Sequence, residues 1–356
     1  MGSERMRGRR AVVARAPHVA VAVLAGLGLT VGLTASPAAA ATTEGNWINE
    51  GGPARSPSAM TALWHDGGTY EAARGEDDRI WWRHGNGAWQ LMPGNARTHL
   101  PPTLAVGDVD ARTQRLVMFR VGDDGAAYYS FLQDRNTNRW TGWSRVPGAL
   151  YLTGEVSATY STNGIQLATA AGNRPYTQQM DLRPGRPLFR PDWAVQDIDT
   201  RELRLSDSFT FTAGEQEFYA SRGLTNTVSI ARTRPGDGRN ARYTELPGGG
   251  RCESVAIGRG GDPGHLATSP FDPGYAAQQN MAIGCISPND HQLYLNRSTD
   301  GGNAWSGWSH STGGPSPSDA APEIHGFPGG EVFAVLSWGS DTAPFKRHMI
   351  VMKRVM

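Results

Sequence analysis

Tryptophan is frequent in this sequence, and many of its tryptophans stand near glycine-containing turns. The 356-residue chain contains 11 Trp and 10 Tyr. Rings of this type can stack on the apolar C–H faces of sugars, while Asp, Asn and Arg side chains bond the sugar hydroxyls. The same rings can fill the space between β-sheets, and we expect roughly half of those near turns to be core. Ligand contact and packing are therefore both open roles for each ring.

Sequence patterns for other chemistries are absent. The chain has no C-x-x-C or H-E-x-x-H metal pattern, no G-x-S-x-G elbow and no phosphate-binding glycine loop. Its nine His are scattered. We therefore expect no metal, no cofactor and no catalytic residue. A two-carboxylate glycosidase stays open as an alternative, because 33 acidic residues do not single out a catalytic pair.

The first forty residues have the pattern of a secretory signal peptide. An Arg-rich start precedes an apolar stretch from Val19 to Leu33, and Ala38–Ala40 supplies small residues for cleavage. A membrane anchor is the alternative, but the apolar stretch is short and no later one is long enough to span a bilayer. We predict that residues 1–40 are removed and that residues 41–356 form a secreted, extracellular protein of bacterial type.

The chain has two cysteines, Cys252 and Cys285. An exported protein meets an oxidising environment, so an even cysteine count predicts one disulfide. Two separate buried thiols are the alternative.

A short phrase, an aromatic residue followed by Pro-Gly or Gly-Gly, recurs roughly every 50 residues. Its copies begin at Trp47, Trp89, Trp143, Tyr243 and Trp308, with a weaker copy at Trp193. Short apolar runs between Gly, Asp, Asn and Pro residues predict strands, and no segment of residues 41–356 keeps a helical periodicity. An all-strand repeat of this length is typical of a β-propeller with about four strands in each blade.

The phrases favour six blades, with seven as the alternative because the unit 251–314 is long. The chain opens with an orphan phrase at Trp47, and its last unit has none. An N-terminal strand that completes the C-terminal blade would close the ring and remove free sheet edges. We predict one all-β propeller domain over residues 41–356; a jelly roll or two stacked sandwiches is the other possibility.

The wording of the units resembles the tryptophan-rich bacterial lectin-like propellers, which are related to fucose-binding propeller lectins. The run Val117–Gly125 and the W-x-x-W pair at Trp140 carry the resemblance best, whereas residues 150–250 match poorly. The resemblance implies glycan binding in pockets between blades. The candidate binding residues that it implies are Trp81, Trp82, Arg83, Trp89, Arg120, Trp140, Trp143, Trp305 and Trp308.

A second resemblance is to the sialidase-type propellers. Ser298, Asp300, Gly302 and Trp305 fit the Asp-box, S-x-D-x-G-x-x-W. A short Asp can cap turn amides, glycine permits the tight turn and Trp packs beneath it. In that family the box is structural, so it supports the fold more than any chemistry. A sialidase-like exo-glycosidase remains the catalytic alternative.

The charge balance bears on the partners. The whole chain has a formal net charge of +1, and loss of the Arg-rich start would leave the rest slightly acidic. That is no polycation, so we expect no nucleic acid. Several similar pockets on one ring would bind a polysaccharide or cell-surface glycan by avidity. A secreted protein-interaction platform or inhibitor is the third alternative.

Overall fold

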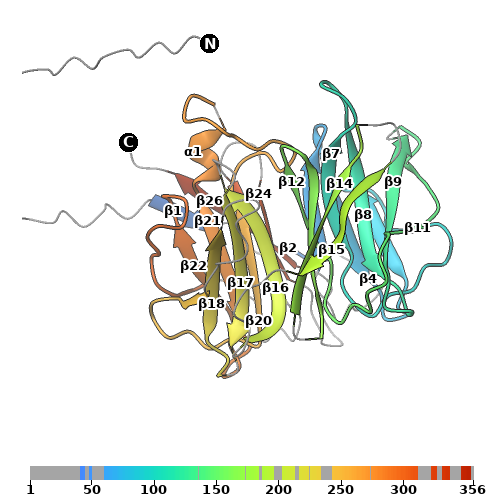
Figure 1. The fold of residues 1–356 in the computed structure, drawn as a ribbon. Coiled ribbons are helices and arrows are strands. Elements are labelled where there is room, and N and C mark those ends of the chain that lie inside the picture. The colour runs from blue at the N-terminus through green and yellow to red at the C-terminus, as the bar shows by residue number, and fades with distance from the viewer. Residues whose placement is uncertain are drawn as a thin grey trace, which may run out of the picture. The chain divides into compact units, whose positions relative to one another are not determined.

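Short strands joined by tight turns make up most of the described chain (Figure 1). The computed structural model describes residues 41–44, 48–49, 60–134, 136–172, 174–183, 187–195, 203–212, 216–223, 225–233, 243–272, 274–311, 322–326, 331–336 and 346–353. All of these fall in one unit, Ala39–Met356. The predicted signal peptide, residues 1–40, and the phrase residue Trp47 lie outside the described residues.

The first three sheets follow one another along the chain. The first consists of β3 (Met60–His65), β4 (Gly68–Arg74), β5 (Ile80–His84) and β6 (Gln90–Leu91). The second consists of β7 (Thr103–Asp108), β8 (Gln114–Val121), β9 (Ala127–Asp134), β10 (Arg139–Trp140) and β11 (Ser144–Arg145). The third consists of β12 (Ser157–Ser161), β13 (Gly164–Ala171), β14 (Arg174–Asp181) and β15 (Leu188–Val195).

Three more sheets complete the described fold. The fourth consists of β16 (Leu203–Thr212), β17 (Gln216–Gly223), β18 (Val228–Thr233) and β19 (Tyr243–Glu245). The fifth consists of β20 (Ser254–Arg259), β21 (Met281–Ile286), β22 (Leu293–Ser298) and β23 (Ser309–His310), with the short helix α1 (Tyr275–Gln278) between β20 and β21. The sixth consists of β24 (Glu323–Gly326), β25 (Glu331–Leu336), β26 (Lys346–Lys353), β1 (Ala41–Glu44) and β2 (Ile48–Asn49).

The sixth sheet joins the two ends of the chain. Ala41 of β1 pairs with Lys353 of β26, and Ile48 of β2 pairs with Arg347 of the same strand. The first strands of consecutive sheets lie against one another from β3 through β7, β12, β16 and β20 to β24, and β24 lies against β3. The described residues therefore form a closed six-sheet β-propeller. The predicted closure by an N-terminal strand is confirmed.

Turn chemistry explains the antiparallel pairing within a sheet. Asp66 and Gly67 join β3 to β4 with φ angles of 50° and 83°, and His65 pairs with Gly68 across the turn. Two successive residues with positive φ form a type I′ turn, whose twist matches that of the flanking strands. This turn lets the first sheet continue from β3 into the antiparallel β4.

The core lies between neighbouring sheets. All six residues of β21 are buried, because an inner strand of a propeller sheet is covered on both faces by the adjacent sheets. A continuous apolar run is the sequence signature of such a strand. One core cluster joins the first two sheets through Leu63, Ile80, Leu104 and Leu116, and another joins the fourth and fifth through Phe218, Leu246 and Ile283.

Candidate functional site

The repeated aromatic residue occupies one position of the propeller sheet. In five sheets it lies two residues before an outer-strand residue that pairs with the third strand. The five aromatic residues are Trp89, Trp143, Trp193, Tyr243 and Trp308, and the corresponding pairs are Leu91 with Trp81, Arg145 with Tyr128, Val195 with Tyr176, Glu245 with Ser229 and His310 with Tyr294. The sequence phrase is thus the outer edge of each of these five sheets.

A glycine at the end of the phrase, or just after it, packs against a Trp ring of the next sheet. A Cβ atom built on Gly148 would lie 2.5 Å from Cδ1 of Trp193, and one on Gly250 would collide with the indole of Trp308. Only a residue without a side chain permits these approaches. Each of these Trp rings therefore rests on the linker that leaves the preceding sheet.

A pocket of about 300 Å³ opens over Trp308, between the fourth and fifth sheets. Its walls are the linker Gly248–Arg251, the β21–β22 turn and the start of β22. The side chains that line it are Trp308, Tyr294, Arg251, Cys285, Ser287 and Asn289. We refer to it below as the Trp308 pocket. It combines two aromatic rings with a few polar groups, which is the composition of small-molecule sites.

Tyr294 lines the Trp308 pocket and is hydrogen-bonded to Asp290, which is not itself part of the lining. The Tyr294 hydroxyl donates to Oδ2 of Asp290 over 2.9 Å, and this hydrogen bond raises the pKa of Tyr294. A hydrogen bond from Ser287, with those from the Gln292 amide and Tyr294, lowers the pKa of Asp290. Asp290 is exposed and therefore places a full negative charge beside the pocket at neutral pH.

The disulfide between Cys252 and Cys285 is present, with the two Cα atoms 5.3 Å apart. This confirms the prediction from the cysteine count. Cys252 directly follows the linker residue Arg251, and Cys285 lies on β21. The bond therefore fastens one wall of the Trp308 pocket to the fifth sheet.

Between the first and second sheets, the space that corresponds to the Trp308 pocket is filled. Arg120 of β8 extends its guanidinium to 4.4 Å from the Tyr128 ring centre and 4.9 Å from that of Trp143. Its Nη1 donates to the carbonyl of Arg97 over 2.6 Å, and burial lowers the pKa of Arg120. Arg120 and Trp143 were each predicted to bind a glycan, and the structure brings them together, but the two side chains contact each other.

Two of the predicted binding residues are core. Trp82 is 2% exposed and Trp140 5% exposed, and their rings meet edge to face with 5.4 Å between centres. This pair fills the space between the first two sheets. Such packing is the alternative role that the sequence left open for each ring.

The remaining predicted residues are partly or fully enclosed. Arg83 is buried, forms an ion pair with Glu71 and lies 4.9 Å from the centre of the Trp89 ring. The half-buried Trp81 directs Nε1 at Asp77 over 3.4 Å. Trp305 is half-buried against the core of the fifth sheet. Among the nine sequence candidates, Trp308 is the one that lines the Trp308 pocket.

Sequence reasoning missed Tyr294, Arg251, Ser287 and Asn289. One signal was available for Arg251, since it stands three residues after Gly248 as Arg97 stands three after Gly94. A signal was also available for Tyr294 of β22, since it stands four residues after Asp290 as Tyr128 stands four after Asp124. Nothing in the repeat singled out Ser287 and Asn289, because they come from the β21–β22 turn, whose length differs from that of the equivalent turns.

The segment predicted as an Asp-box forms a tight turn after β22. Oδ1 of Asp300 accepts the amides of Asn303 and Ala304 over 3.0 and 2.9 Å, and the Ser298 hydroxyl accepts the amide of Gly302 over 2.9 Å. The turn lies at the far end of β22 from Tyr294 and contributes nothing to the Trp308 pocket. Its assignment to the sialidase-type box stays a prediction.

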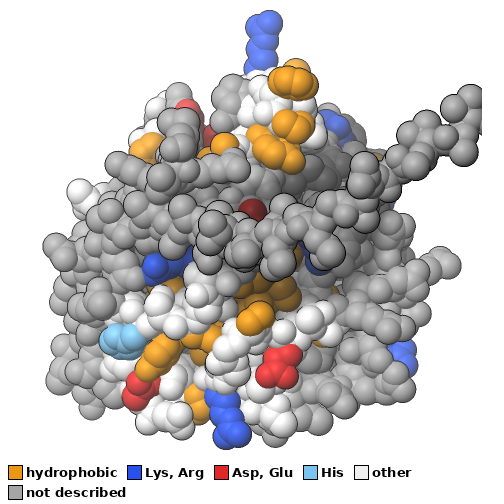
Figure 2. Space-filling view, turned by 90° about the vertical axis from the view of Figure 1, so that its left-hand side faces the viewer, with side chains coloured by type: hydrophobic (Ala, Val, Ile, Leu, Met, Phe, Trp, Pro, Cys, Tyr) orange, Lys and Arg blue, Asp and Glu red, His pale blue; other side chains and the backbone are white. Residues whose placement is uncertain are grey.

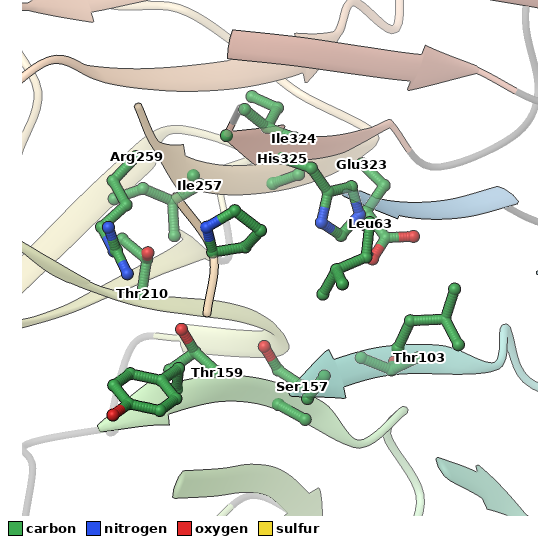
Figure 3. A pocket seen from close by; sticks show the side chains of 18 of the residues that line it. Leu63, Thr103, Ser157, Thr159, Thr210, Ile257, Arg259, Glu323, Ile324 and His325 are labelled. Atoms are coloured by element: carbon green, nitrogen blue, oxygen red, sulfur yellow. Dashed lines mark ion pairs between the residues drawn. The ribbon is translucent and has the colours of Figure 1, made fainter. Parts of the chain in front are cut away.

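A narrow cavity of about 70 Å³ runs along the first strands of the sheets (Figure 3). Arg259 and Thr210 lie on one side of it, and Glu323, His325 and Leu63 on the other. His325 Nε2 is 2.8 Å from Oε1 of Glu323. Burial, reinforced by Glu323, raises the pKa of the nearby Glu155 to about 8. The cavity is too narrow for a sugar ring.

The connection between β20 and β21 covers one end of this region. Arg259 is buried and donates to the carbonyl of His265 over 2.9 Å, and burial lowers the pKa of Arg259 to about 10. Gln114 of the second sheet donates to the carbonyl of Gly264. This connection therefore reaches across the ring from the fifth sheet to the second.

A wider groove of about 650 Å³ lies at the β3–β4 and β7–β8 turns. It is lined by charged and polar side chains, among them Asp66, Asp110, Arg112 and Arg115, and by no Trp, Tyr or Phe. It therefore lacks a platform on which a sugar ring could stack.

Acidic and basic side chains are interspersed, not separated by sign, among the described residues of the face drawn in Figure 2. Within the described ranges, no group of three His, Cys, Asp or Glu side chains is placed to bind a metal ion. The part of the chain that the structure describes contains no helix long and apolar enough to cross a bilayer.

Comparisons with known proteins support the fold. No protein-family profile matches the sequence, and no curated protein matches it. Among solved structures, a protein of unknown function from Dyadobacter fermentans is 10% identical with a TM-score of 0.57, covering 88% of this chain and 99% of its own. The fucose-specific lectin from Aleuria aurantia is 10% identical with a TM-score of 0.52, covering 85% and 99%.

AofleA from Arthrobotrys oligospora has a TM-score of 0.53 at 10% identity, covering 88% of this chain and 94% of its own. At such identities the likeness concerns the fold alone. The chain thus shares the β-propeller fold of these proteins along most of its length.

Proposed function

We propose that this protein is a secreted carbohydrate-binding propeller that holds a sugar in the Trp308 pocket. The observation that carries the proposal is the pocket itself. It presents the Trp308 and Tyr294 rings together with the polar groups of Arg251, Ser287 and Asn289. Its volume of about 300 Å³ is at the lower end of small-molecule sites, which suits one or two sugar rings.

The similar folds support this proposal in general terms. The Aleuria aurantia protein is named as a fucose-specific lectin, which is a property of that protein. Here the likeness adds that a propeller of this kind can bind a sugar. The identity of the sugar in this chain has to come from its own pocket residues.

Secretion is part of the same proposal. The signal-peptide pattern of residues 1–40 agrees with a disulfide that needs an oxidising compartment to persist. Residues 41–356 would then act outside the cell as one propeller domain. An extracellular glycan, free or on a cell surface, would be the partner.

Multivalent binding needs more than one open pocket. At the first interface Arg120 fills the equivalent space. We propose that the Trp308 pocket provides the main site and that avidity arises where other interfaces are also open. A binding stoichiometry above one would establish this part.

The sialidase-like alternative finds less support. Its chemistry needs three arginines around one carboxylate. None of the three cavities described above is lined by three arginines. Arg259, in the narrow cavity along the first strands, already donates to backbone carbonyls. Turnover of a fluorogenic sialoside would reinstate this alternative.

The proposal is tested on a glycan array with neutral, acidic and amino sugars. We expect saturable binding by the purified secreted protein and its loss in Trp308→Ala. The matched control is Phe271→Ala, which removes a 96% exposed ring that is not part of the pocket lining. A blank array, or unchanged binding by folded Trp308→Ala, contradicts the proposal.

A further inference from the structure

The Trp308 pocket matches the surroundings of Arg120 position by position. Arg120 pairs with Tyr128 across β8 and β9, and Cys285 pairs with Tyr294 across β21 and β22. Each tyrosine donates to the aspartate four residues before it, over 2.8 and 2.9 Å. In both sheets the third strand, β9 or β22, therefore carries a tyrosine ring whose hydroxyl is hydrogen-bonded to an aspartate carboxylate.

The linkers also correspond. A Cβ atom built on Gly94 would lie 3.7 Å from Cδ1 of Trp143, and one on Gly248 would lie 3.3 Å from Cδ1 of Trp308. Three residues after each glycine stands an exposed arginine, Arg97 or Arg251. Each arginine also forms an isolated β-bridge with the residue just before the third strand of the preceding sheet, Arg97 with Arg79 and Arg251 with Thr227.

The two places differ in the side chain on the second strand. At the first interface Arg120 places a guanidinium between the Tyr128 and Trp143 rings. At the other, Cys285 is short and bonded to Cys252, so the space between Tyr294 and Trp308 stays open. In the first sheet Arg83 also lies 4.9 Å from a Trp ring, that of Trp89, but it belongs to the third strand, β5, and is not the counterpart of Arg120.

We propose that the Trp308 pocket binds a protonated amino group of its ligand in the place that Arg120 fills at the first interface. The ligand class is then a glycan with unacetylated amino sugars. This inference rests on the proposed function and names its ligand. A cation between two aromatic faces is attracted by both ring quadrupoles, and Asp290 supplies the carboxylate that Asp124 supplies beside Arg120.

The positive charge of Arg251 does not prevent a protonated amino group from binding in the Trp308 pocket. Its counterpart Arg97 is equally exposed and contributes its carbonyl, not its side chain, to Arg120. An exposed guanidinium is screened by salt. The Arg251 carbonyl stands in the corresponding linker position, 3.4 Å from Sγ of Cys285. The disulfide sulfur has no hydrogen to donate, so this carbonyl can still accept a hydrogen bond from an amino group.

The test compares two ligands that differ only at nitrogen. A β-1,4-linked glucosamine tetramer and its fully N-acetylated counterpart are titrated calorimetrically into the whole secreted protein at about pH 6. We expect the free-amine tetramer to bind roughly tenfold more tightly, and to lose this advantage in Trp308→Ala. Arg120→Ala should open a further pocket and raise the stoichiometry above the wild-type value by about one.

The outcomes separate this inference from the proposed function. Equal binding of both tetramers, or array hits confined to neutral or acidic sugars, overturns the amino-group inference and leaves sugar binding intact. If no glycan binds, and an arginine-containing peptide binds over Trp308 instead, both the amino-group inference and the proposed sugar binding are overturned. The wild-type comparison of the two tetramers needs no variant, so a folding defect in Arg120→Ala cannot hide the answer.

Discussion

The rings of Trp82 and Trp140 meet edge to face, 5.4 Å between centres and 73° between planes, and so join the first sheet of the propeller to the second. Trp140→Ala would remove a buried ring from this contact. We expect a loss of about 3–5 kcal/mol in the free energy of unfolding, measured by urea denaturation. Unchanged stability would show that the ring is not a core element.

Gly148 is the second structural test. Its φ of 113° and the nearby Trp193 ring leave no room for a side chain. Gly148→Ala should destabilise the protein by about 2 kcal/mol or more. Gly142→Ala is the matched control, since a Cβ atom built on Gly142 meets nothing within 4 Å, and it should change stability by less than about 0.5 kcal/mol. Equal effects of both variants would refute the packing role of the phrase glycine.

The disulfide predicts a redox-dependent stability. It closes a loop with a sequence separation of 33 between Cys252 and Cys285, which corresponds to about 3–4 kcal/mol. Reduction should lower the melting temperature in calorimetry, and the Cys252→Ala/Cys285→Ala variant should melt at the reduced value with or without reductant. A wild-type melting temperature that is unchanged by reductant would contradict this expectation.

Glu155 predicts a fall in stability with rising pH. Burial, with the charge of Glu323, raises its pKa to about 8 in the folded protein, whereas the unfolded chain releases the proton near pH 4.5. Between these values the folded state holds more protons, so the free energy of unfolding decreases as pH rises.

The measurement is urea unfolding at about pH 5 and pH 8. Glu155→Gln should be more stable than wild type at the higher pH by more than about 1 kcal/mol, and its stability should vary less between the two pH values. Glu76→Gln, which alters an exposed carboxylate, should leave the pH dependence unchanged. A wild-type stability that does not fall with pH would show that the Glu155 carboxyl is not held neutral.

Much of the fold follows from the spacing of one phrase. The outer-strand position of Trp89, Trp143 and Trp308 was predictable, because a repeat in sequence becomes a repeat in register. Closure was predictable from the orphan phrase at Trp47, which directly precedes β2. These inferences need only strand periodicity and the cost of a free sheet edge.

The pocket was harder to predict. Trp143 and Trp308 are the second residues of similar W-x-x-W pairs, yet Trp143 lies against Arg120 and Trp308 lines a cavity. The difference depends on what the neighbouring second strand carries, Arg120 in one sheet and Cys285 in another. That equivalence appears only once the strands are paired, since the turns between them differ in length.

The central claim is that the ring of Trp308 forms part of a sugar site. The most direct measurement is calorimetric titration of an array-selected glycan into wild type, Trp308→Ala and Phe271→Ala, each shown to be folded by circular dichroism. We expect at least about tenfold weaker binding in Trp308→Ala and wild-type affinity in Phe271→Ala. Wild-type affinity in Trp308→Ala would contradict the central claim.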